Sequence, residues 1–146
     1  MQSKVQKRFW AGFQGALILI VIMYVFEIIN IAGNPGFVHT YRSFFGPHYA
    51  FIDHLVAAFL FAVSGGIWGI IFGIVPSPSP LRGMAFGLLP SLWLWLVVVP
   101  STGGPVFNGF AAKGIILPLI FNCVIWGSYV GWYGQKFLER HPVHSK

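Results

Sequence analysis

The ionisable residues that could do chemistry gather in one stretch of the sequence, between residues 27 and 54. Two of the three acidic residues, Glu27 and Asp53, lie at its ends, and His54 follows Asp53 directly. Three further side chains that can carry a positive charge lie between them: His39, Arg42 and His48. Carboxylate, imidazole and guanidinium groups at this spacing could form ion pairs, bind a divalent metal, or pass protons and cations.

Three interpretations of this cluster are open. In the first, Asp53 begins a helix, where the helix dipole favours a negative charge, and Glu27 pairs with Arg42 or with His54. In the second, a divalent metal such as zinc, iron or manganese has four ligands: Glu27, His48, Asp53 and His54. No tight HxxxH or ExxH spacing supports that site. In the third, the cluster is an entry site for protons or cations, because ionisable residues at membrane depth are costly and tend to be functional.

The sequence does not indicate an enzyme. Ser64, Ser91 and Ser128 lie in apolar stretches without a neighbouring His or Asp, and there is no GxSxG motif. Phosphate-binding and dinucleotide-binding fingerprints are also missing. Haem held by two histidines needs them well inside two helices, and only His54 borders a predicted helix. No catalytic residue and no cofactor is therefore assigned, and binding of a pigment through a single histidine remains open.

The composition indicates that these residues are positioned by elements within a membrane. Of 146 residues, 56% are hydrophobic and 8% are charged, whereas a soluble globular domain has roughly 25% charged residues. The net charge of +6 does not indicate nucleic-acid binding, because the basic residues lie at the ends of apolar runs. The single cysteine, Cys123, excludes an intramolecular disulfide and a cysteine-based metal cluster.

Four apolar stretches are predicted to cross the membrane as helices, since a hydrocarbon core about 30 Å thick needs ~20 helical residues. They cover residues 9–32, 53–75, 81–99 and 114–137. The first is longer than the apolar region of a signal peptide, so we expect it to stay as an anchor. The stretches are too continuous for strands of a membrane barrel. We therefore expect one all-α integral membrane domain over residues 1–146, folded as a four-helix transmembrane bundle.

The basic residues predict the orientation of this bundle through the positive-inside rule. With the N-terminus in the cytoplasm, seven basic residues face inward: Lys4, Lys7, Arg8, Arg82, Lys136, Arg140 and Lys146. Two face outward, Arg42 and Lys113. Both termini are thus expected in the cytoplasm, and the loops 33–52 and 100–113 outside. The first of these loops is rich in phenylalanine and is expected to lie on the membrane surface.

A motif repeated in the second and fourth predicted helices suggests an internal duplication. Trp-Gly-x-x-x-Gly occurs at residues 68–73 and again at residues 126–131. Two duplicated helical hairpins would be related by an axis along the membrane normal. Pro90 and Pro118 lie inside the third and fourth helices and are expected to kink them.

Glycines make a narrow stripe on the second and fourth predicted helices, at Gly65, Gly69 and Gly73 and at Gly127 and Gly131. Small residues let helix backbones approach each other closely in a membrane. We predict that the stripes pack the second and fourth helices against each other. The alternative is that a stripe is an exposed interface for a dimer or a partner.

The two Trp-Gly-x-x-x-Gly hairpins, the early Gly12-x-x-Gly15 and the membrane-surface loop resemble uncharacterised bacterial inner-membrane proteins of the YagU-like kind. The resemblance covers most of the chain in layout. It implies a bacterial origin and a four-helix bundle, and it supplies no catalytic residue.

We expect a non-enzymatic accessory or structural subunit of a larger membrane complex in the inner membrane. It would use an exposed glycine stripe and the aromatic outer hairpin, and its partners would be lipids and other membrane proteins or copies of itself. The alternative is a small homodimeric transporter or channel, with a path from Glu27, Asp53 and His54 along the kinks at Pro90 and Pro118. A transporter needs a wet cavity around the acids, whereas a subunit can bury them in a local ion pair.

Overall fold

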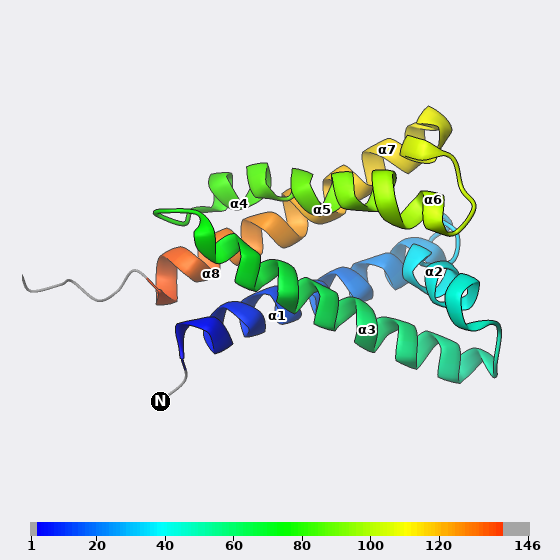
Figure 1. Ribbon diagram of the computed structural model, residues 1–146, viewed down its shortest axis with the longest axis horizontal. Helices are drawn as coiled ribbons and strands as arrows, with labels where there is room; N and C mark the ends of the chain where they lie inside the picture. Colours follow the sequence, from blue (N-terminus) through cyan, green and yellow to red (C-terminus); the bar gives the residue numbers. More distant parts are fainter. Residues whose placement is uncertain (1–2, 139–146) are drawn as a thin grey trace, which may run out of the picture.

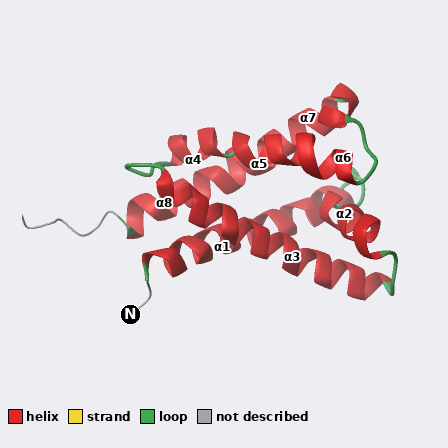
Figure 2. Cartoon of the chain, viewed as in Figure 1, coloured by secondary structure: helices red, strands yellow, loops and turns green. Residues whose placement is uncertain are grey.

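The computed structural model describes residues 3–138 and contains only helices and loops over that range (Figure 2). Four helical spans are long and apolar enough to cross a membrane: Lys4–Ile28, Ala50–Ile74, Pro80–Ser101 and Ala112–Phe137. The protein is therefore an all-α, multi-pass membrane protein, as its composition predicts. Two of the basic residues expected in the cytoplasm, Arg140 and Lys146, lie outside the described residues.

The spans are built from seven α-helices and several tighter or wider turns within residues 3–138. The first span is α1 (Lys4–Ile28), and the second is α3 (Ala50–Ile71) with a 3-10 turn (Phe72–Ile74). The third joins α4 (Pro80–Phe86), α5 (Leu88–Trp93), a π-helical turn (Leu94–Val98) and α6 (Val99–Ser101). The fourth joins α7 (Ala112–Leu119), a π-helical segment (Ile120–Gly127) and α8 (Ser128–Phe137). Between spans lie α2 (Gly36–Phe45) and a 3-10 stretch (Val106–Phe110).

The first helix begins at Lys4, earlier than the predicted start at Phe9, because Ser3 caps it. The Ser3 hydroxyl accepts a hydrogen bond from the backbone N–H of Gln6 at 3.2 Å, and the Gln6 side chain accepts one from the N–H of Ser3 at 2.9 Å. This reciprocal pair is a capping box, which satisfies two backbone donors at the helix start. The helix ends at Ile28, and Asn30 takes a positive φ of 58°.

The third and fourth spans are irregular where the sequence predicts kinks. Gly87 separates α4 from α5, and Pro90 lies in the first turn of α5. Pro118 lies inside α7, just before the π-helical segment begins. Proline has no backbone N–H and its ring clashes with the preceding turn, so the regular hydrogen-bond ladder cannot continue through it.

The four spans form two hairpins (Figure 1). The first span packs along α3, and α4 packs along the π-helical segment and α8. The N-terminus, the end of α8 and the connector 75–79 lie at one end of the bundle, which we call the terminal end. The opposite end holds α2 and the segment after α6, and we call it the loop end.

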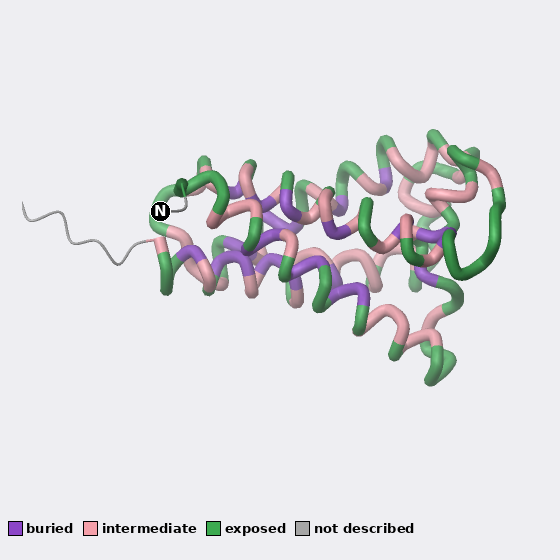
Figure 3. Tube along the Cα trace, turned by 90° about the horizontal axis from the view of Figure 1, so that it is seen from below, coloured by how far each residue is buried: buried purple, intermediate pink, exposed green. Residues whose placement is uncertain are grey.

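The core that joins the two hairpins lies mainly in the half of the bundle nearer the N-terminus (Figure 3). Its buried members are Ala16, Leu19, Ile20, Ala62, Phe72, Phe86, Phe121, Trp126 and Val130. Trp126 of the fourth span donates a hydrogen bond from Nε1 to the carbonyl oxygen of Gly12 at 3.0 Å. Trp68 of α3 packs edge-on against Phe86 of α4, with ring centroids 6.2 Å apart. Each tryptophan of the repeated motif thus reaches into the other hairpin.

The glycine stripes close each hairpin internally. A Cβ on Gly69 of α3 would lie 2.8 Å from Cα of Gly12 in α1. A Cβ on Gly83 of α4 would lie 3.0 Å from Cα of Gly131 and would collide with the carbonyl oxygen of Gly127. The prediction that the glycine stripes of the second and fourth spans pack against each other is therefore wrong. Each stripe instead meets a matching glycine on the preceding span, because two helix backbones touch only where both carry very small residues.

The second-span stripe is also occupied at its other two positions. A Cβ on Gly65 would lie 2.5 Å from Cβ of Ala16, and a Cβ on Gly73 would collide with the side chain of Arg8. The alternative that this stripe is an exposed partner interface is therefore wrong as well.

Candidate functional site

Asp53 forms a closed ion pair at the loop end. It lies in the first turn of α3, its side chain is fully buried, and its Oδ2 is 2.7 Å from Nε of Arg42 on α2. The backbone N–H of His48 donates to both carboxylate oxygens at 3.2 Å, and His48 Nδ1 lies 3.4 Å from Oδ1. The carboxylate thus holds α2 and the following loop against the start of α3.

His54 points toward a partner on α1 that the sequence did not suggest. Its Nδ1 lies 2.7 Å from the hydroxyl oxygen of Tyr24. Glu27, one turn further along α1, is half-buried and forms no ion pair with another residue of the described chain. The prediction that Glu27 pairs with Arg42 or with His54 is wrong, because Asp53 and Tyr24 take those partners.

The predicted metal ligands are divided among these pairs. Within residues 3–138, no group of three or more His, Cys, Asp or Glu side chains is placed to hold a metal ion. Asp53 faces the guanidinium of Arg42, whose positive charge would repel a cation there. The geometry therefore supports the local ion-pair interpretation of the cluster, and it does not assemble the ligand set Glu27, His48, Asp53 and His54.

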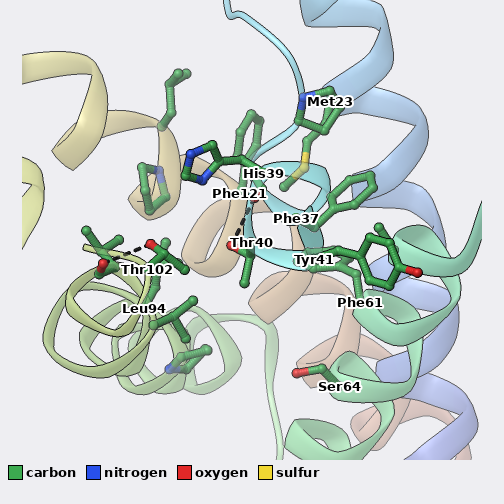
Figure 4. Close-up of a pocket in the computed structure, with 18 of the residues that line it drawn as sticks. Met23, Phe37, His39, Thr40, Tyr41, Phe61, Ser64, Leu94, Thr102 and Phe121 are labelled. Atoms are coloured by element: carbon green, nitrogen blue, oxygen red, sulfur yellow. Dashed lines mark hydrogen bonds between the residues drawn. The ribbon is translucent and has the colours of Figure 1, made fainter. Parts of the chain in front are cut away.

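A large apolar crevice lies between the two hairpins at the loop end (Figure 4), with a volume of about 1100 Å³. Its walls come from α1 and α3 on one side and from α5, α6 and the fourth span on the other, and α2 covers the loop end. Apolar side chains make up most of the lining, including Leu19, Met23, Phe61, Leu94 and Phe121. None of the lining residues is an aspartate or a glutamate, so the crevice is separate from the Asp53 pair.

Polar side chains lie at two levels of the crevice. Toward the loop end they are Asn34, His39, Thr40, Tyr41, Thr102, Asn108 and Lys113. Lys113 donates from Nζ to the carbonyl oxygen of Ile31 at 3.2 Å, which links the fourth span to the end of the first. Figure 4 shows His39 near this end and Ser64 further along α3.

Two polar residues line the crevice near the middle of their spans, Ser64 of α3 and Asn122 of the π-helical segment. Asn122 donates from Nδ2 to Oγ of Ser91 at 3.1 Å, and Ser91 donates to the carbonyl oxygen of Gly87 at 3.0 Å. Sequence reasoning did not single out Asn122 or Tyr24. An amide in an apolar run is costly in a membrane, and that signal was available for Asn122.

No protein-family model, no curated protein and no solved structure matches this chain. The resemblance to YagU-like inner-membrane proteins therefore stays a prediction from the sequence layout. The crevice and the closed ion pair are the two features on which a function can be argued.

Proposed function

We propose that this chain is a non-enzymatic accessory subunit of a larger complex in a bacterial inner membrane. The observation that carries the proposal is the closed state of Asp53, which is fully buried beside Arg42. A transport path through the acids would need water around them, and neither Asp53 nor Glu27 lines the crevice. The carboxylate of Asp53 is buried and depends on Arg42 for its counter-charge, which suits a fixed structural contact better than a site that loads and releases ions.

The distribution of charge supports a cytoplasmic location for the terminal end. Lys4, Lys7 and Arg8 begin the first span, and Lys136 lies in the last turn of α8. At the loop end, the described Lys and Arg residues are Arg42, which pairs with Asp53, and Lys113. This asymmetry follows the positive-inside rule and turns α2 and the crevice mouth outward.

The surface that we assign to the partner is the exposed aromatic face of α3. Phe51, Leu55 and Phe59 are all exposed and recur every fourth residue, so they lie on one side of the helix. Gly65 and Gly69 face α1 instead. Phe44 and Phe45 at the end of α2 are exposed as well, and they extend the apolar surface at the loop end.

Affinity purification in mild detergent tests the proposal. We expect the tagged wild-type chain to retain one defined larger membrane protein at constant stoichiometry. The reciprocal purification, with the tag on that partner, should recover this chain. Replacing Phe51, Leu55 and Phe59 together by alanine should lower recovery of that protein by about tenfold or more, because large apolar side chains dominate such contacts. The matched control replaces Leu88, Leu92 and Leu96, which are exposed at the same spacing on the third span.

The control triple variant should retain the partner. Equal recovery with both triple variants would refute the assigned surface. A wild-type chain that purifies alone from its native membrane, at every detergent tested, would refute the accessory role.

A small homodimeric transporter or channel is the second candidate, and one observation favours it. Pro90 and Pro118, where the third and fourth spans are interrupted, both line the crevice. Transporters often build their sites from interrupted helices near the membrane midplane. This candidate predicts a clean dimer that moves ions after reconstitution into vesicles, with lower flux for Glu27→Gln. No flux above that of protein-free vesicles would exclude it.

A further inference from the structure

We propose that the crevice binds one membrane lipid with an anionic headgroup. Its acyl chain would lie between the hairpins, and its headgroup would lie beside Lys113 at the loop end. Phe51, Leu55 and Phe59 of the partner surface do not line this crevice, although Phe44 and Phe45 border both. The lipid site would exist in the isolated chain.

Apolar residues on both walls of the crevice are exposed. Leu60 of α3 and Trp93 of α5 line its two walls, and they are 45% and 51% exposed. The described fold therefore leaves an apolar entrance on the flank of the bundle. A lipid can enter sideways through such an entrance without leaving the bilayer.

The walls of the crevice suit a flexible chain. Contact between water and an apolar wall is unfavourable, and apolar side chains, with Leu and Phe the most frequent, make up most of the lining. An acyl chain replaces that water and adapts to uneven walls. At the far end, the buried residues Phe121 and Trp126 close the space.

A transmembrane helix of a partner suits this space less well. Helices approach each other in membranes through very small residues. The glycines that could offer such a face are already used within the hairpins, Gly65 and Gly69 against α1 and Gly83 against the fourth span. On the crevice side of α3 the small residues Ala57 and Ser64 are interrupted by large ones, Leu60, Phe61 and Trp68, and α5 adds Trp93, so the wall is uneven.

The charge at the loop end selects the headgroup. Lys113 is the one Lys or Arg among the described lining residues, and no acidic residue accompanies it. Its ammonium has three donors, and the structure records one bond to protein, to the carbonyl oxygen of Ile31. The remaining donors can bind a phosphate group. Asn108 lines the same end of the crevice, and its Nδ2 donates to the carbonyl oxygen of Gly114 at 2.9 Å.

Native mass spectrometry of the purified, delipidated protein tests the proposal, with phosphatidylglycerol and phosphatidylcholine added in equal amounts. We expect a complex with one lipid per chain that favours phosphatidylglycerol. Ser64→Trp would fill the crevice from α3 and should lower lipid binding by about tenfold, since a bulky ring excludes the acyl chain. Ile67→Trp is the matched control, because Ile67 is exposed on the same helix and does not line the crevice.

The charge is tested separately by Lys113→Gln, which leaves the apolar walls intact. The preference for phosphatidylglycerol should fall to near equality with phosphatidylcholine, whereas Lys136→Gln at the terminal end should keep it. Unchanged preference in Lys113→Gln would overturn the headgroup assignment. Equal lipid binding by the two tryptophan variants would overturn the site. So would a polypeptide that purifies with the wild-type chain and is lost in Ser64→Trp while lipid binding is unchanged.

Because this measurement uses the isolated chain, its failure would leave the accessory role standing. Conversely, a chain that binds the lipid but recruits no protein would refute only the accessory role.

Discussion

At the residue scale, partner choice decides what the few ionisable side chains do. The sequence places Glu27, Asp53 and His54 at one level of the bundle, and it cannot say which cation faces which carboxylate. That choice depends on how α2 turns Arg42 toward α3 and on the backbone N–H of His48. Tyr24, to which the sequence analysis assigned no role, forms a hydrogen bond with His54.

Replacement of Arg42 by alanine should destabilise the protein, because it leaves the buried carboxylate of Asp53 without its counter-charge. We expect the midpoint of thermal unfolding in detergent to fall by about 5 °C or more. Glu27→Gln is the matched control, since Glu27 has no ion-pair partner within residues 3–138. A similar midpoint for both variants would show that the Asp53 pair contributes little to stability.

At the element scale, glycines determine which helices lie together. Their spacing is readable in the sequence as a packing stripe, but the stripe does not name its partner. The structure pairs each stripe with the preceding span, where Gly12 and Gly83 allow backbone contact. The helix α2 was expected as a loop, because its flanking glycines and prolines are typical of turns.

Gly69→Leu should open the first hairpin. Its Cβ would lie 2.8 Å from Cα of Gly12, and backbone cannot move aside as a side chain can. We expect a loss of about 3 kcal/mol or more in the free energy of unfolding, the upper range for overpacking. Gly33→Leu is the control, since no atom lies within 4 Å of a Cβ at Gly33. Denaturant titration followed by circular dichroism measures both, and equal stability would contradict the backbone contact.

At the scale of the whole molecule, the two hairpins are joined strongly near the terminal end and separated by the crevice at the loop end. Trp126 is central to the junction, since its ring is buried and its Nε1 bonds to Gly12 across the hairpins. The crevice is the space that remains where the spans diverge beyond this junction.

Trp126→Phe should loosen the junction while keeping an aromatic ring. Loss of the hydrogen bond and of part of the indole should cost about 1–2 kcal/mol. Trp132→Phe provides the comparison, because Trp132 is 42% exposed on α8. Thermal unfolding of both variants in the same detergent measures the difference. A larger loss of stability for Trp132→Phe than for Trp126→Phe would contradict the central position of Trp126 in the junction.

The sequence by itself determined that the chain is a membrane protein, that it has four helices long and apolar enough to cross the membrane, and that glycines mediate contacts between helices. These properties follow from composition and from the length of apolar runs, which are local quantities. Only the tertiary structure decided that the stripes pair within each hairpin, that Asp53 is neutralised by Arg42, and that a crevice remains between the hairpins. Those features depend on the rotation and tilt of whole helices, because residues far apart in the chain must meet at the same depth and on facing sides.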